Sequence, residues 1–147
     1  MRIEAVDYFV SAQERLNDAN LLYEKARYSF ALYAAGVAVE SLLRAYIFRL
    51  EPKLEAAHNL RILFTASRIH ALTTQVEHGQ IGSAIGDLFK RWRNDLRYTS
   101  NDRLRRHLKK DKLDRGVRGD FLKENCRIAI EAANTIIKIG APKWKPF

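Results

Sequence analysis

The sequence predicts an all-α protein, an antiparallel four-helix bundle with one or two additional short helices. Apolar residues recur at spacings of three and four, no strand-like alternation bounded by turns occurs, and the chain has only 7 Gly and 3 Pro. The chain has 147 residues, the length of one domain. We therefore expect a single bundle over residues 1–140, followed by a C-terminal tail over residues 141–147.

The first two predicted helices cover residues 3–27 and 30–50. The first carries its apolar residues on one face, and Ser29 is expected to cap the helix that follows. The second begins with a run of small residues and ends before Pro52. Small side chains let two helix backbones approach closely, so we expect this helix at the centre of the bundle.

The remaining helices are less regular in pattern. A third helix is expected to begin near Asn59, whose side chain can accept an unpaired backbone N–H. The glycine-rich residues 79–86 follow no strand and lack the lysine of a phosphate-binding loop, so we interpret them as a turn. That turn leads into a fourth helix over residues 80–96, and a last helix covers residues 119–139.

Nearly all of the net charge lies in one segment, residues 90–118. It contains twelve basic and four acidic residues, and so carries +8 of the formal +9 of the whole chain. Such a segment suits a polyanion such as RNA or a nucleotide, and Trp92 and Tyr98 in it could stack on bases. A solvated surface and an acidic protein partner are the alternatives. The residues leave open whether 103–112 forms a helix or a mobile flap.

Residues for metal or nucleophilic chemistry are scattered. The four histidines form no pair at i, i+4 and have no cysteine or carboxylate at metal-ligand spacing, so neither a metal nor another cofactor is expected. The single cysteine, Cys126, lies among apolar residues and is expected in the core. Glu40 and Arg44 are four apart, which predicts a partly buried ion pair, and arginines of the fourth helix could also reach Glu40.

Three short segments, in this order, resemble the HEPN domain family of four-helix-bundle proteins. They are YAAGVAVESLLRA at residues 33–45, AHNL at residues 57–60 and RNDLRY at residues 93–98. The resemblance extends over roughly residues 1–140. It marks Glu40, Arg44, His58 and Asn59 as structural family positions.

The resemblance implies one of two kinds of function. Many family members are metal-independent ribonucleases, often toxins, that use an arginine, a following polar residue and a histidine four to six residues further on. Arg93 and Asn94 match the start of that motif, but Tyr98, Thr99 and Ser100 stand where the histidine belongs. No other histidine of the chain follows an arginine at that distance. Other members are noncatalytic and bind RNA, nucleotides or a nucleotidyltransferase.

We therefore expect a noncatalytic RNA- or nucleotide-binding protein, part of a toxin–antitoxin or nucleotidyltransferase-associated system. The alternative is a divergent ribonuclease toxin that uses Arg93 with Tyr98 or His107. A third interpretation makes the arginines helix-packing and dimer-contact residues only. The candidate binding residues are Arg93, Asn94, Arg97, Tyr98, Arg103, Arg105, Arg106 and His107.

The expected partners are RNA or a nucleotide, a second copy of the chain and a nucleotidyltransferase. No membrane partner is expected, because the uncharged stretch over residues 28–39 is shorter than the ~20 residues of a membrane span. Glu4 and Asp7 lie where a signal peptide would have its apolar core. A cytoplasmic location follows as an expectation.

Overall fold

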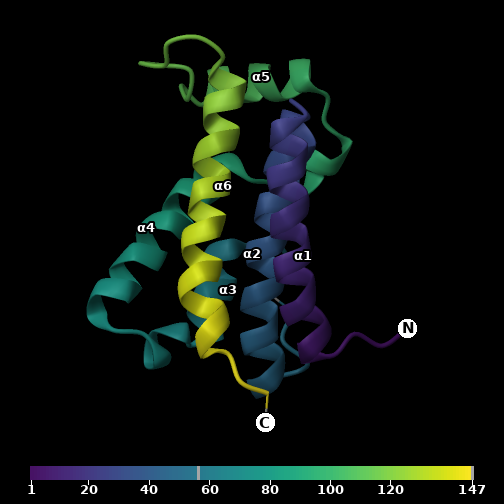
Figure 1. Cartoon of the computed structure of the whole chain (residues 1–147), viewed down its shortest axis with the longest axis vertical. Helices are drawn as coiled ribbons and strands as arrows, with labels where there is room; N and C mark the ends of the chain where they lie inside the picture. The colour runs from purple at the N-terminus through teal and green to yellow at the C-terminus, as the bar shows by residue number, and fades with distance from the viewer. Residues whose placement is uncertain (56, 147) are drawn as a thin grey trace.

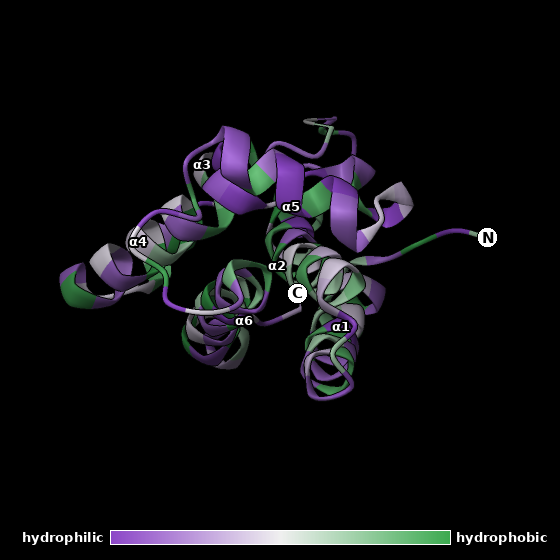
Figure 2. Cartoon of the chain, turned by 90° about the horizontal axis from the view of Figure 1, so that it is seen from above, coloured by the Kyte–Doolittle hydropathy of each residue, from purple (hydrophilic) through white to green (hydrophobic). Residues whose placement is uncertain are grey.

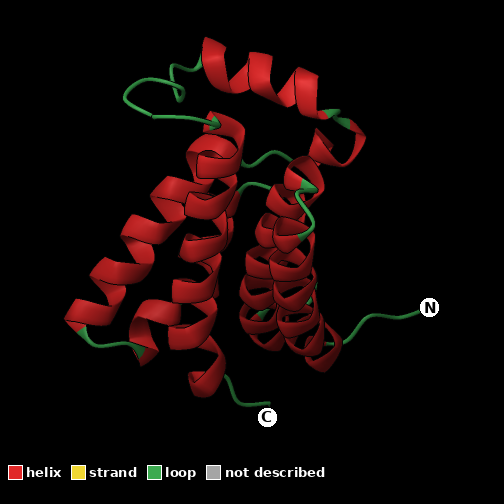
Figure 3. Ribbon diagram, turned by 45° about the horizontal axis from the view of Figure 1, so that its top comes forward, coloured by secondary structure: helices red, strands yellow, loops and turns green. Residues whose placement is uncertain are grey.

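The computed structural model describes residues 1–55 and 57–146, and these residues confirm the all-α prediction. Figure 1 shows the chain rising through α1, descending through α2, rising again through α4 and descending through α6. Figure 3 shows only helices and loops in this part of the chain. The α-helices are α1 (Ala5–Glu24), α2 (Tyr28–Leu50), α3 (Leu60–Ser67), α4 (Gln75–Arg91), α5 (Asn101–Lys110) and α6 (Phe121–Gly140). The 3₁₀ helices are η1 (Ile69–Leu72), η2 (Asn94–Tyr98) and η3 (Ala141–Lys143).

The helix α2 forms the centre of the core, as its small residues predict. Ala31, Ala35 and Ala38 are fully buried, and α2 packs against α1, α3 and α6. It is long and apolar enough to cross a membrane, but 78% of its most apolar window is buried inside the protein. Burial by its neighbours accounts for that apolarity, as in the core helix of a globular bundle.

Of the two helix caps predicted on either side of α2, one is wrong and one is confirmed. The prediction that Ser29 caps α2 is wrong, because α2 begins at Tyr28, after Ala26 has ended the previous helix in a left-handed conformation with φ 57°. Ser29 lies within the first turn, where its backbone N–H donates to Asn101 Oδ1 at 3.3 Å. Asn59 does cap α3, because its Oδ1 accepts from the backbone N–H groups of Arg61 and Ile62 at 3.1 Å.

The fourth helix is longer at its start and shorter at its end than the sequence pattern predicted. It begins at Gln75, where Thr74 and Glu77 form a reciprocal capping box. The glycine-rich segment at residues 79–86 is therefore helical and not a turn. Its buried face, which includes Ile81, Ile85 and Leu88, offsets the low helix propensity of the glycines.

The chain after α6 folds back onto the first two helices. Trp144 is buried and stacks on Phe9 of α1, with ring centroids 4.5 Å apart. Arg49 Nη1 of α2 donates to the backbone oxygen of Lys145 at 2.8 Å. The C-terminal segment thereby covers the end of the bundle opposite α5 (Figure 1).

Candidate nucleic-acid interface

A hollow of about 350 Å³ lies between η2 and α5. It brings together four of the eight predicted binding residues, which come from two segments of the chain. Those four are Arg93, Tyr98, Arg103 and His107, and Asp95, Leu96 and Thr99 complete the lining. Its volume is that of a small-molecule site, and three of its lining residues are basic or can become cationic.

The η2 side of this hollow is fixed by the residue that follows α4, Trp92. Its indole is buried, and Nε1 donates to the backbone oxygen of Tyr33 at 3.0 Å. A Cβ on Gly36 would lie 2.0 Å from Trp92 Cδ1, so the indole occupies the space that any other residue at 36 would fill. Trp92 therefore anchors this segment to α2. The prediction that Trp92 stacks on bases is wrong, because its ring is buried.

Arg93 begins the exposed part of this segment and contacts an acidic neighbour. Its Nε and Nη2 donate to Oδ1 and Oδ2 of Asp95, both at 3.2 Å. Both side chains are more than half exposed and both line the hollow. The guanidinium is thus aimed into the site, but a carboxylate occupies its bidentate face.

Tyr98 is the most exposed aromatic side chain of this surface, with 80% of its area accessible. The guanidinium carbon of Arg97 lies 4.6 Å from the centroid of the Tyr98 ring, a cation–π contact. Arg97 Nη1 also donates to the backbone oxygen of Asn94 at 3.0 Å. Interaction with the side chains of Tyr98 and Tyr33 raises the pKa of Arg97, so this cation is retained throughout the usual pH range. Asn94 thus contributes its backbone carbonyl group, which holds the side chain of Arg97.

The other wall of the hollow is α5, and the structure resolves the open question about residues 103–112 in favour of a helix over Asn101–Lys110. Ser100 caps it by accepting from the backbone N–H of Arg103 at 3.1 Å. Leu104 and Leu108 are fully buried, which turns the basic positions outward. In Figure 2 most of the α5 ribbon is purple, the colour of hydrophilic residues.

The basic side chains of α5 differ in whether an acidic side chain lies close to them. Arg105 lies 3.3 Å from Asp102 and 4.0 Å from Asp120, and His107 Nε2 lies 3.4 Å from Asp111 Oδ2. Within residues 1–55 and 57–146, no ion pair involves Arg103, Arg106, Lys109 or Lys110, and all four are exposed. These four are the cations most available to an anionic ligand.

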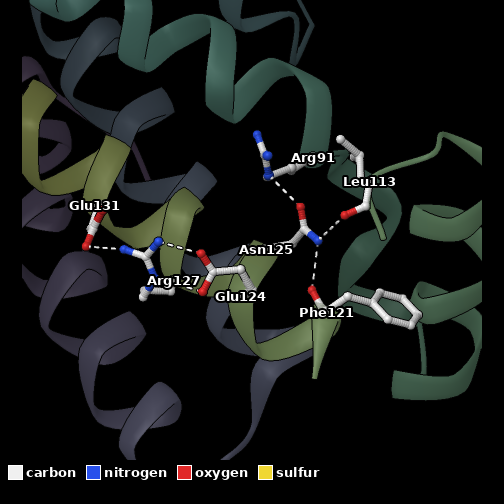
Figure 4. Close-up of polar contacts among 7 residues, drawn as sticks. All are labelled: Arg91, Leu113, Phe121, Glu124, Asn125, Arg127 and Glu131. Carbon is white, nitrogen blue, oxygen red and sulfur yellow. Dashed lines mark hydrogen bonds and ion pairs between the residues drawn. The ribbon is translucent and has the colours of Figure 1, made fainter. Parts of the chain in front are cut away.

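A buried polar network, which sequence reasoning missed, joins α4, α6 and the connection after α5 (Figure 4). Asn125 Oδ1 accepts from Arg91 Nε at 2.8 Å, and Asn125 Nδ2 donates to the backbone oxygens of Leu113 and Phe121 at 2.9 and 2.7 Å. Burial lowers the pKa of Arg91. The signal in the sequence was an asparagine on the apolar face of the last helix. The hydrogen bonds of Asn125 fix the position at which the chain returns from α5 to the bundle.

The structural family positions form a separate cluster. Glu40 Oε1 lies 2.5 Å from His58 Nδ1 and 3.7 Å from Arg44 Nη2, and Arg44 also donates to the backbone oxygen of Ala57. The predicted Glu40–Arg44 pair is confirmed. The expected pairing of Glu40 with arginines of the fourth helix is wrong, because Arg91 turns toward Asn125 instead. The cluster holds the α2–α3 connection against α2.

Cys126 and the histidines offer no further reactive centre in the described part of the chain. Cys126 is fully buried, as predicted, and burial raises the pKa of its thiol to about 12. A thiol in that state is a poor nucleophile. Among residues 1–55 and 57–146, no group of three or more His, Cys, Asp and Glu side chains could hold a metal ion.

The chain was compared with protein families, with curated proteins and with solved structures. The family model described as HEPN domain matches residues 5–144, nearly the whole chain. No curated protein and no solved structure matches significantly. The matched region includes α1, α2, the hollow, α5 and α6.

Proposed function

This chain belongs to the HEPN domain family, and from that premise we propose that it binds RNA or a nucleotide through the η2–α5 surface without cleaving it. The observation that carries the proposal is the convergence of Arg93, Arg103 and His107 on one hollow, beside a row of exposed α5 cations. Clustered cations repel one another unless an anion compensates them. Phosphate groups supply that compensation and release counterions when they bind.

The chemistry of RNA cleavage argues for binding without turnover. Metal-free cleavage must remove a proton from the 2′-hydroxyl and protonate the leaving oxygen, and histidine suits both steps at neutral pH. At the family's histidine position the chain has Tyr98. A phenol lacks the basic ring nitrogen with which an imidazole takes up a proton, so tyrosine is a poor replacement for histidine as the general base.

A second candidate, the divergent ribonuclease, is favoured by one specific observation. His107 reaches the hollow from α5 and lines it together with Arg93, although the two are fourteen positions apart in the chain. An imidazole can transfer protons and a guanidinium can stabilise charge on a phosphate, and metal-free RNA cleavage requires both tasks. The family's sequence motif does not match this pair, because His107 lies on α5 and not within the few residues that follow Arg93.

Fluorescence anisotropy with a short labelled RNA tests the binding proposal. We expect affinity that falls as salt rises, with a log–log slope that steepens by roughly 0.7 for each phosphate that the protein neutralises. The double variant Arg103→Gln/Arg106→Gln should weaken binding and flatten that slope. The control Arg2→Gln/Arg61→Gln removes the same charge from the N-terminus and α3, and should bind as the unmodified protein does. Absence of binding at low salt would refute the proposal.

Incubation of purified protein with labelled RNA separates the two candidates. Intact RNA supports the noncatalytic function. Cleavage that both Arg93→Ala and His107→Ala abolish would establish the ribonuclease, whereas cleavage unaffected by either variant identifies a contaminant.

We also propose that the protein is cytoplasmic, forms a homodimer and pairs with a nucleotidyltransferase in a toxin–antitoxin arrangement. Support comes from the family, several of whose members act in this way. Light scattering after size exclusion measures the oligomeric state, and copurification with the product of a neighbouring nucleotidyltransferase gene tests the pairing. A monomer that retains no such partner would contradict this part of the proposal.

A further inference from the structure

We propose that Tyr98 is the stacking platform for one unpaired base and that the RNA strand continues from it along α5 toward Lys110. This inference rests on the proposed RNA-binding function and adds to it a required ligand, a strand with unpaired bases. It also gives the strand a path and a length on the surface.

The two faces of the Tyr98 ring differ in what covers them. Arg97 covers one face with its guanidinium 4.6 Å from the ring centroid, and 80% of the side chain remains accessible. Among residues 1–55 and 57–146, the other exposed Phe, Tyr and Trp side chains are Phe30 and Phe89, which are 48% and 38% accessible, so Tyr98 is the most open of these rings. A ring held on one face by a cation and open on the other is built to accept a second flat group. A nucleobase is such a group.

Two arginines line the same hollow as the Tyr98 platform. Tyr98 lines the same hollow as Arg93 and Arg103, so a base stacked on its ring carries its own phosphate toward two guanidinium groups. The hollow, about 350 Å³, is within the size range of a small-molecule site. One nucleotide can therefore stack its base on Tyr98 and place its phosphate beside the two guanidinium groups at the same time.

Basic side chains on α5 continue from the hollow and give the strand its path. Arg103, Arg106 and Lys110 are separated by three and four positions and therefore form one stripe along α5. Seven residues of helix rise about 10 Å, the axial length over which one stacked strand presents about three phosphates. All three side chains are exposed. Because Arg103 belongs to both the hollow and the stripe, the nucleotide on Tyr98 is the first of these, and the surface fits a segment of about three nucleotides.

A duplex is not the preferred ligand of this surface. Both faces of each internal base in a duplex are covered by neighbouring bases, so none can stack on Tyr98 without being unpaired. A duplex would contact only the α5 cations, and a free mononucleotide would contact only the hollow and the platform. A short single strand contacts all three.

Anisotropy titrations with four labelled ligands test the inference. They are a six-nucleotide RNA, an abasic strand of the same length, a duplex of the same length and a mononucleotide. We expect the six-nucleotide RNA to bind tightest, and Tyr98→Leu to weaken it between about fivefold and a hundredfold. Tyr98→Leu should leave the abasic strand unaffected, and Tyr98→Phe should bind RNA as the unmodified protein does. Phe89→Leu is the control for loss of an exposed aromatic residue.

The outcomes separate this inference from the function on which it rests. If Tyr98→Leu binds RNA as well as the unmodified protein does, or if duplex and single strand bind equally, the platform is refuted while RNA binding stands. If none of the four ligands binds at low salt, both proposals fail. Circular dichroism of each variant checks folding, which the exposed position of Tyr98 should leave intact.

Discussion

The carboxylate of Asp95 occupies the bidentate face of Arg93, with Oδ1 3.2 Å from Nε and Oδ2 3.2 Å from Nη2. The two residues are only two positions apart, and the 3₁₀ turn that begins at Asn94 brings their side chains to the same side. A phosphate that approaches Arg93 must compete with this carboxylate for the same two N–H groups. Asp95 therefore limits the affinity of the hollow for anions.

Removing the charge of Asp95 should tighten binding. In Asp95→Asn the guanidinium loses its ionic competitor, and the hollow also loses one negative charge. Exposed ion pairs of this kind contribute at most about 1 kcal/mol, so we expect affinity for short RNA to rise by up to about fivefold. Anisotropy at low salt measures the change.

The control for this variant is Glu14→Gln on α1, which changes the net charge equally and also removes an exposed ion pair, with Arg15 at 3.4 Å. It should leave the affinity unchanged. Equal increases in both variants would show that the net charge of the protein, and not the Arg93–Asp95 pair, limits binding.

Gly36 and Gly82 should respond in opposite directions to alanine. At Gly36 the new Cβ would meet Trp92 Cδ1 at 2.0 Å, and we expect Gly36→Ala to lower the free energy of unfolding by at least about 2 kcal/mol. At Gly82 nothing lies within 4 Å of the new Cβ, so Gly82→Ala should raise it by up to about 1 kcal/mol. Urea denaturation measures both. A Gly36→Ala protein as stable as its parent would contradict the assigned position of Trp92.

Asn125→Ala should destabilise the protein and loosen the connection after α5. The change leaves Arg91 Nε and the carbonyl group of Leu113 without their partner, which costs about 1–3 kcal/mol for each buried group. Two such groups predict a fall of about 2–6 kcal/mol in the free energy of unfolding, and we expect hydrogen exchange of residues 111–120 to accelerate. Asn134→Ala, which removes one hydrogen bond to Ile130 from an exposed asparagine of the same helix, should have a small effect on both.

The Glu77 carboxylate should make stability depend on acid pH. A hydrogen bond from Lys143, followed by the backbone N–H in the Thr74 cap, lowers the pKa of Glu77 below its ordinary 4.5. A lowered pKa in the folded state means that this stabilisation is present above pH 4.5 and is lost as the pH falls through the lower value. Urea denaturation at pH 7 and pH 3 should therefore show a smaller difference in Glu77→Gln than in the parent.

A second variant identifies the source of this effect. Lys143→Met removes the largest cause of the lowered pKa, so it should also reduce the pH dependence of the unfolding free energy. In the Glu77→Gln background the same change should add nothing further. An unchanged pH dependence in Glu77→Gln would show that other carboxylates account for the acid sensitivity.

Features set by local pattern were predictable from the sequence. The recurrence of apolar residues at spacings of three and four located the core helices and the burial of Cys126, and the side-chain oxygen of Asn59 predicted its cap. The start of α4 was also encoded locally, in the Thr74–Glu77 capping box, but three glycines concealed it. Propensity is a weak signal compared with an apolar face that can be buried.

Features set by residues far apart in the chain were not predictable in this way. Trp92 is an aromatic residue in a basic segment, and only the empty space beside Gly36, 56 positions earlier, makes it a core residue. The placement of His107 in the hollow likewise depends on the tertiary fold, which makes η2 and α5 line the same hollow. The sequence showed where the charge lies but not which cations are already neutralised.

The helix α5 is attached to the bundle by two fully buried side chains, Leu104 and Leu108, whereas α2 buries fourteen residues. Local unfolding of α5 therefore costs much less free energy than unfolding of the whole domain. A ligand that binds only the folded helix must supply that ordering cost, and in return it rigidifies the helix. The bundle around α2 thus stays folded with or without a ligand, whereas the fraction of molecules with a folded α5 rises when the ligand binds.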